Sequence, residues 1–251
     1  MKIIIAPAKK MVIDQDSFPI RSMPDFLDKT QILWDFLKSR DYAQLKDIWR
    51  ANDKIVKENQ LRLQNEDLKK QLTPAIFAYS GLQYQYIGAG VLEQEGLDYL
   101  QENLRVVSGL YGLLRPFDGI IPYRLEMQNK LVGFRDYSLY HFWNDRLYQA
   151  IYQEDEVVIN LASKEYSRLF TPYIKENQQF ITIEFLEEKH GKWRQSATHA
   201  KMARGAMVRF MAQNQVTNIH ELQAFNDFGY HFDEESSTSN KYVFKKEVEV
   251  N

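Results

Sequence analysis

Short apolar runs alternate with longer amphipathic stretches along the chain, and this alternation predicts strands separated by helices. The first run, residues 2–6 (KIIIA), is typical of a buried strand because its isoleucines follow one another without a polar residue between them. Four more strands are predicted at the apolar runs 74–79 (PAIFAY), 104–108 (LRVVS), 156–162 (EVVINLA) and 180–187 (FITIEFLE). The run at 74–79 is entered through a proline, which ends the helix before it.

Apolar positions that recur every three or four residues predict helices between these strands. The predicted helices cover residues 24–38, 41–50, 52–71, 91–103, 138–153, 198–214 and 218–225, with a short one starting at Ser163. Residues 192–197 are predicted to pair with 180–187 across a turn at Gly191, and residues 230–246 to form a hairpin. Because no repeat or linker divides the chain, we expect one domain over residues 1–251. Its expected fold class is α+β (mixed α/β), a mixed β-sheet surrounded by helices.

Composition limits the classes of protein that the chain can belong to. With 251 residues, 44% hydrophobic and 26% charged, it has ordinary globular values and enough length for a sizeable core. The absence of cysteine excludes disulfides, thiolate metal sites and thiol nucleophiles. The apolar run in the N-terminal sequence MKIIIAPAKK is too short for a signal peptide or a membrane span, and no later run reaches membrane-spanning length. We therefore expect a cytoplasmic protein without a membrane partner.

Charge is unevenly distributed, although the formal net charge is only −2. Between residues 189 and 220 there is no Asp or Glu, and six cations occur there: Lys189, Lys192, Arg194, Lys201, Arg204 and Arg209. The first acid of the chain, Asp14, follows Lys2, Lys9 and Lys10. A near-neutral average is therefore compatible with a positive face, and an anionic partner responds to this local field.

The predicted helix 198–214 places cations on one side and apolar residues on the other. Lys201, Arg204 and Gly205 share the polar side, whereas His199 lies on the apolar side, where a core histidine is the expected role. A solvated basic face would explain this pattern. An anion-binding face would explain it too, because no acid is spaced to pair with these cations, and because Gly205 costs about 1 kcal/mol of helix propensity. A glycine between two cations fits a surface that another molecule approaches closely.

Two loops with candidate anion-binding residues each come directly after a predicted strand. Lys9 and Lys10 in PAKKM follow the first strand, and the carboxyl ends of such strands are where α/β proteins bind ligands. In NLASKEY, Ser163 can cap a short helix whose free N–H groups attract anions. Exposed lysines and simple helix capping explain the two loops equally well.

The segment 107–127 (VSGLYGLLRPFDGIIPYRLEM) is apolar, bent by glycines and prolines, and still contains two arginines and two acids. One interpretation is structural, with Arg115 and Arg124 each paired to Asp118 or Glu126 to hold the loop. In the other, a rigid loop presents guanidinium groups for phosphate and aromatic faces for bases to a cleft. The aromatic candidates are Tyr111, Phe117 and Tyr123, and the residues alone leave both interpretations open.

Taken together, PAKKM, VSGLYGLLRPFDGIIPYRLEM, NLASKEY, AKMARGAMVRF and FNDFGYHFDEESS resemble the YaaA family of bacterial peroxide-stress proteins, in order and essentially end to end. The chain departs from the family at Gln128, where PYRLEMG has glycine, and matches only loosely at 79–87. The resemblance implies a cytoplasmic protein that limits peroxide damage, with lowered free iron and protection of DNA from Fenton chemistry. It also implies a positively charged cleft that binds DNA largely without regard to sequence, and a helix–hairpin–helix element, for which 198–214 and 218–225 are candidates. Carried over by motif, the phosphate-binding residues are Lys9, Lys10, Arg115, Arg124, Lys201 and Arg204.

Three functional hypotheses follow. The first is a DNA-binding protein of the peroxide response, with Tyr111 and Tyr123 as stacking candidates. The second is an enzyme on a nucleotide or damaged nucleobase, with Glu126 as general acid or base and Lys9 or Lys201 as phosphate holder or nucleophile. The third, direct iron binding, has little support, because the five histidines show no ligand spacing. We expect no cofactor and no bound metal.

Overall fold

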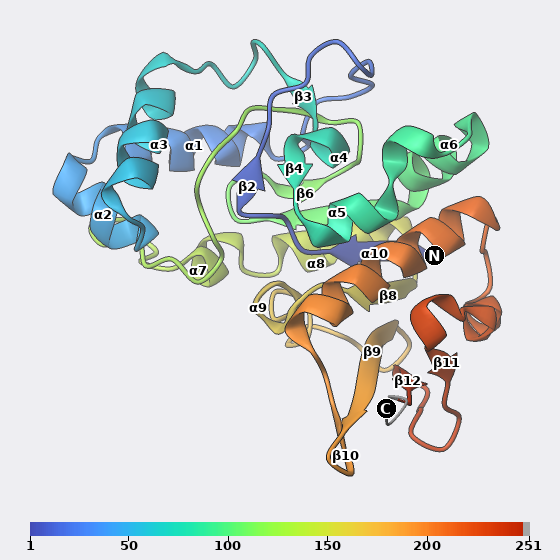
Figure 1. Cartoon of the computed structure of the whole chain (residues 1–251). Coiled ribbons are helices and arrows are strands. Elements are labelled where there is room, and N and C mark those ends of the chain that lie inside the picture. The colour runs from blue at the N-terminus through green and yellow to red at the C-terminus, as the bar shows by residue number, and fades with distance from the viewer. Residues whose placement is uncertain (248–251) are drawn as a thin grey trace.

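One eight-stranded sheet organises the computed structural model, which describes residues 1–247. The strand order is β11-β12-β9-β8-β1-β5-β6. Strand β10 pairs with the outer part of β9, at the bottom of the view in Figure 1. The strands are β1 (Lys2–Ile5), β5 (Leu104–Ser108), β6 (Gly112–Leu114), β8 (Val157–Leu161), β9 (Gln179–Lys189), β10 (Lys192–Arg194), β11 (His231–Phe232) and β12 (Lys241–Lys246). The pairs β1–β5, β1–β8, β8–β9 and β9–β12 are parallel, and the pairs at the edges are antiparallel. The predicted mixed sheet is confirmed.

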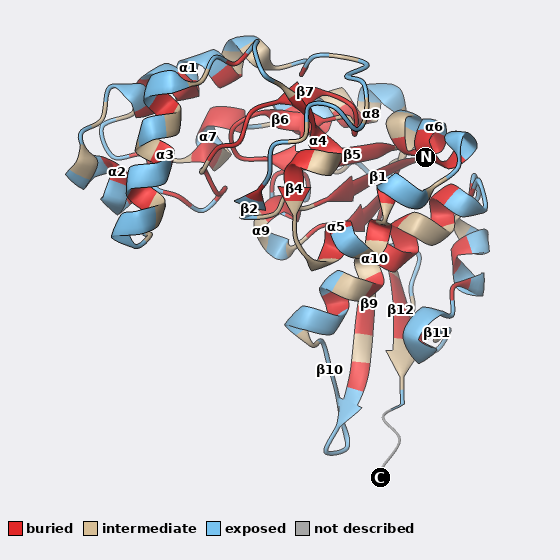
Figure 2. Ribbon diagram, turned by 45° about the horizontal axis from the view of Figure 1, so that its top comes forward, coloured by how far each residue is buried: buried red, intermediate tan, exposed pale blue. Residues whose placement is uncertain are grey.

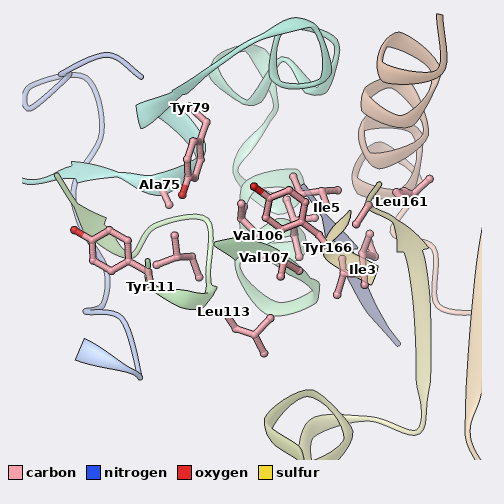
Figure 3. Packing of buried hydrophobic residues seen from close by; sticks show 14 of the residues in the cluster. Ile3, Ile5, Ala75, Tyr79, Val106, Val107, Tyr111, Leu113, Leu161 and Tyr166 are labelled. Carbon is pink, nitrogen blue, oxygen red and sulfur yellow. The ribbon is translucent and has the colours of Figure 1, made fainter. Parts of the chain in front are cut away.

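Strand β1 lies at the centre of this sheet. Its three isoleucines are fully buried, because β5 and β8 flank it and helices and loops cover both faces. Figure 3 shows Ile3 and Ile5 packed among Val106 of β5 and Leu161 of β8. The chain leaves β1 to form β5 on one side of it and later returns to form β8 on the other side. In parallel sheets, ligands bind outside the carboxyl ends of the strands at such a reversal of strand order.

Helices surround the sheet, and three of them form a separate group at one end of the molecule. The helices are α1 (Leu27–Lys38), α2 (Tyr42–Trp49), α3 (Asp53–Asn65), α4 (Ala75–Ala78), α5 (Leu82–Ile87), α6 (Gln94–Asn103), α7 (Leu139–Trp143), α8 (Arg146–Glu154), α9 (Lys164–Ser167) and α10 (Ala197–Gln213). The end group contains α1–α3, whose outer faces are exposed, whereas the central strands are buried (Figure 2). The long helix α10 packs along α5 and α6.

Residues 74–79 are not the strand that their apolar run predicts. The segment contains the end of β3 (Thr73–Pro74), then α4, and then the start of β4 (Tyr79–Ser80). The two short strands pair with β7 (Gly119–Ile120) and β2 (Lys10–Met11) rather than with the main sheet. A six-residue apolar run indicates that the segment is buried, but not that it is a strand. Here the segment is buried in an irregular layer instead of the main sheet.

Other element boundaries also differ from the prediction. The helix expected over 138–153 is interrupted at Asn144, which has a positive φ of 48°, and α3 ends at Asn65 rather than at 71. Residues 218–225 form the 3-10 helix η2 (Ile219–Ala224) instead of an α-helix, and α5 had no predicted counterpart. The shorter 3-10 helices η1 (Ala89–Val91) and η3 (Asp227–Gly229) complete the set of elements. The two C-terminal pairings, β9 with β10 and β11 with β12, are confirmed.

Candidate functional site

A pocket of about 410 Å³ opens at the carboxyl ends of β1 and β8, where the strand order reverses. Its walls come from five distant parts of the chain: residues 6–10, 80–84, 123–126, 163–166 and the start of α10. These parts include the motifs PAKKM, PYRLEM, NLASKEY and AKMARG, which lie up to about 190 residues apart in the sequence. Tertiary folding therefore brings four of the conspicuous sequence motifs around one hollow.

Glycines permit the close backbone packing that shapes two of these walls. A Cβ on Gly109, just after β5, would lie 2.6 Å from the backbone oxygen of Leu125, so only glycine lets residues 123–126 run against the strand end. A Cβ on Gly205 in α10 would overlap the backbone oxygen of Gln83 in α5. The interpretation that Gly205 faces another molecule is wrong, because α5 of the same chain occupies that position. The glycine instead sets the distance between the two helices that carry pocket residues.

Glu126 is the centre of an ion-pair cluster in the pocket. Its Oε2 lies 2.6 Å from Nζ of Lys9, and its Oε1 lies 2.6 Å from a guanidinium nitrogen of Arg124. The Arg124–Glu126 pair agrees with the structural interpretation of the 107–127 segment, and both side chains are largely buried. Since two cations share one carboxylate, the cluster keeps a net positive charge.

The remaining pocket cations have no such partner. Within residues 1–247, Lys10, Lys201 and Arg204 form no ion pair with any acid. Lys10 and Lys201 are exposed, whereas Arg204, which also lines the pocket, is half-buried. Burial lowers the pKa of the Arg204 guanidinium, and the more distant carboxylate of Glu184 opposes that effect. A desolvated cation without an ion-pair partner gains most from a bound anion.

A hydrogen-bonded group of hydroxyls lies behind the pocket. The hydroxyl of Tyr123 is 2.8 Å from that of Tyr79 and 2.6 Å from Oγ of Ser108. The Ser108 hydroxyl in turn accepts from the backbone N–H of Tyr111 at 2.9 Å. Burial raises the pKa of Tyr123 to about 12, so its phenol stays neutral near pH 7. Tyr123 lines the pocket, and these hydrogen bonds fix the orientation of its hydroxyl.

Three of the residues predicted to face a ligand lie elsewhere, and one of them, Phe117, is fully buried outside the pocket. Arg115 does not line the pocket and donates from one guanidinium nitrogen to both oxygens of Asp25, at 2.7 and 2.5 Å. Tyr111 is fully buried; its hydroxyl accepts from the N–H of Ile121, and its ring packs edge-on against Tyr123. Figure 3 shows Tyr111 apart from Tyr166, which does line the pocket. The other predicted binding and catalytic residues all line it: Lys9, Lys10, Tyr123, Arg124, Glu126, Lys201 and Arg204.

Sequence reasoning missed several polar residues of the pocket, among them Glu165 and Gln83. Burial raises the pKa of Glu165 above its ordinary value of 4.5, and the nearby charge of Glu126 raises it further. The available signal was that Glu165 lies in the motif NLASKEY, but the prediction concerned only Ser163 of that motif. Ser163 occupies the N-cap position of α9, yet its side chain makes no capping hydrogen bond. Gln83 belongs to the loosely matching stretch 79–87, where no motif pointed to it.

The histidines do not form a metal site in the described part of the chain. Across residues 1–247, no group of three or more His, Asp or Glu side chains is arranged to hold a metal ion. His199 is not the core residue that its helix pattern predicts: its side chain is 50% exposed, and Nδ1 lies 2.6 Å from Oε1 of the buried Glu187. Over the same residues, we find no helix that combines the length and the apolar character needed to cross a membrane.

Comparison with known proteins gives a consistent assignment. The family model described as "Peroxide stress protein YaaA" matches residues 1–236. Similar chains include a UPF0246 protein of Lactobacillus johnsonii, 60% identical over 246 residues that cover 98% of both chains. A UPF0246 protein of Lactobacillus helveticus is 55% identical over 245 residues, covering 98% of this chain and 97% of that one. Another, of Lactiplantibacillus plantarum, is 50% identical over 244 residues, covering 97% and 98%. Matched along nearly its whole length, the chain belongs to the YaaA family of peroxide stress proteins.

Proposed function

We propose that this peroxide stress protein binds DNA through the cations of the pocket, largely without reading sequence, and so limits iron-dependent damage. The observation that carries the proposal is the meeting of Lys10, Lys201 and Arg204 at one pocket, without an ion pair among residues 1–247. Phosphate contacts of this kind supply the sequence-independent part of DNA affinity.

Binding of this type also accounts for protection. A protein that neutralises phosphates releases the cations condensed along the duplex. Iron(II) held on DNA is one such cation, and it generates hydroxyl radicals where it sits when peroxide is present. Displacing it moves the radical chemistry away from the bases and the sugars. The proposal therefore needs no iron site in the protein.

Charge reversal of the two exposed lysines tests the proposal. We expect the variant Lys10→Glu/Lys201→Glu to lose most of its affinity for a fluorescently labelled duplex, measured by anisotropy at 50 and 200 mM salt. The slope of log affinity against log salt should fall by about 1 for each phosphate contact removed. Both side chains are exposed, so the melting temperature should stay unchanged.

The matched control is Lys54→Glu/Lys57→Glu, which reverses two exposed lysines of α3 that do not line the pocket. It changes net charge by the same amount, so it separates a local contact from general electrostatic attraction. Equal affinity loss in both variants, or no salt dependence in the unmodified protein, would refute DNA binding at this pocket.

A second candidate is an enzyme acting on a nucleotide or a damaged nucleobase in the same pocket. The observation that favours it is the pair Glu165 and Glu126, whose environments differ. The pKa of Glu165 is raised, whereas both oxygens of Glu126 are engaged in ion pairs. In many active sites, two carboxyl groups in different environments divide the roles, with one acting as the general acid and the other staying ionised. Glu165, rather than Glu126, is then the proton donor.

The enzyme hypothesis predicts a definite pH dependence. A general acid with a raised pKa is protonated at low pH and deprotonates as pH rises through that value. The rate of base or phosphate release, followed by chromatography, should therefore fall as pH increases above the ordinary glutamate pKa of 4.5. Glu165→Gln should abolish turnover. Absence of released product from nucleotides and lesion-bearing duplexes at every pH would leave binding as the function.

A further inference from the structure

Unmet hydrogen-bond donors are concentrated at the pocket. Four buried side-chain nitrogen or oxygen atoms in residues 1–247 have no hydrogen-bond partner in the protein, and three of them belong to pocket residues. These three are Nε2 of Gln83, Nε of Arg124 and Nε of Arg204. A buried donor left without an acceptor costs about 1–3 kcal/mol, so native proteins keep few of them. Three such donors on side chains that line one hollow favour a ligand that brings several acceptor oxygens.

The three donors belong to different walls of the hollow. Gln83 is in α5 and only 7% exposed, Arg124 follows β7 with a side chain 14% exposed, and Arg204 is in α10. An internal phosphodiester carries a sugar on both sides and has only two free oxygens, so it reaches such recessed atoms poorly. A terminal phosphoryl group has three free oxygens and a single ester bond. It can enter the pocket end-on and accept from several walls at once.

Charge and volume favour the same group. A phosphomonoester carries a charge of about −1.5 to −2 at pH 7, and the pocket contains five cationic side chains against the carboxylates of Glu126 and Glu165. The volume of about 410 Å³ exceeds the need of a phosphate alone and falls among ordinary small-ligand sites. Three largely buried tyrosines also line it, and aromatic surfaces suit an attached nucleoside: Tyr84, Tyr123 and Tyr166.

We propose that the pocket binds a nucleoside phosphomonoester, either a free mononucleotide or the phosphorylated end of a DNA strand. The second source rests on the DNA-binding function proposed above and specifies which part of the nucleic acid enters the pocket. The exposed pocket lysines Lys10 and Lys201 then hold flanking phosphates. The buried donors of Gln83, Arg124 and Arg204 hold the terminal one.

Calorimetric titration of the full chain with four small probes tests the ligand chemistry directly. We expect deoxyadenosine 5′-monophosphate to bind, inorganic phosphate to bind more weakly, and deoxyadenosine and cyclic 3′,5′-AMP not to bind measurably. Anisotropy with otherwise identical duplexes, carrying 5′-phosphate or 5′-hydroxyl ends, then identifies the source. At least tenfold tighter binding of the phosphorylated duplex assigns the strand end, and equal binding together with mononucleotide binding assigns the free nucleotide.

A variant isolates the recessed donors. Gln83→Met keeps side-chain length and removes the N–H donors without a change in charge, and it should weaken mononucleotide binding about tenfold. The matched control is Gln85→Met, an exposed position in the same helix, which should bind as the unmodified chain does. An unchanged affinity in a folded Gln83→Met variant would overturn the assignment of that donor.

The outcomes separate this inference from the proposed function. Duplex binding that depends on Lys10 and Lys201 but ignores end phosphorylation, with no mononucleotide or phosphate binding, would overturn the inference alone. Mononucleotide binding without any duplex binding would support the pocket's ligand class and refute the DNA-binding function. The small-molecule titrations need no substitution, so the inference stays testable even where a variant fails to fold.

Discussion

Replacing Gly205 by alanine should lower the free energy of unfolding by about 3 kcal/mol, at the upper end of ordinary overpacking costs. Alanine is the better helix former by about 1 kcal/mol, so propensity alone predicts the opposite sign. The new Cβ would overlap the backbone oxygen of Gln83 and lie 2.8 Å from Cβ of Tyr86. A backbone oxygen cannot move aside as a flexible side-chain end can. Helix α10 must therefore shift away from α5, and urea denaturation monitored by circular dichroism measures the cost.

Gly90→Ala is the matched control for this substitution. A Cβ there would meet nothing closer than 3.9 Å, so we expect little change or a slight gain in stability. The displaced α10 carries Lys201 and Arg204, so Gly205→Ala should also weaken binding of duplex and mononucleotide in the fraction that remains folded. Unaltered stability of Gly205→Ala would mean that the two helices do not pack at this distance, and the pocket described above would lose one wall.

Replacing Glu126 by glutamine should produce two effects of opposite sign. The substitution removes the only carboxylate that pairs with Arg124 within residues 1–247 and leaves a largely buried guanidinium uncompensated. Breaking such a pair by removing one partner typically costs about 3 kcal/mol of folding stability. At the same time the pocket loses a negative charge next to Lys9 and Arg124, so an anion should bind about tenfold more tightly.

Chemical denaturation and calorimetric titration with deoxyadenosine 5′-monophosphate measure the two effects on the same preparation. Glu188→Gln is the control, because this exposed glutamate of β9 lies outside the pocket and forms no ion pair in the described residues. It should change neither quantity. Weaker anion binding by Glu126→Gln would contradict the electrostatic account and would indicate that the Glu126 carboxylate contacts the ligand itself.

The main sheet was predictable because its central strands report their own burial. The uninterrupted isoleucines of β1 and the apolar run of β5 are buried only when other strands flank them and both sheet faces are covered. The turn at Gly191, which has a φ of +70°, likewise requires only local information. Residues 74–79 were mispredicted because a short apolar run cannot distinguish a sheet from an irregular buried layer. Their partners are residues 10–11 and 116–120, which no local pattern connects to them.

For the candidate site, the chain alone was sufficient to indicate which motifs are unusual and that cations dominate them. Which of those cations remain unpaired depended on the fold. Arg115 and Lys10 are equally charged in sequence, yet Asp25, 90 residues away, pairs with Arg115 and no acid among residues 1–247 pairs with Lys10. Gly205 could be read as a contact for a partner until α5 was seen against it. Helix periodicity and strand burial are properties of neighbouring residues, whereas neutralisation, desolvation and close packing arise between segments that only folding brings into contact.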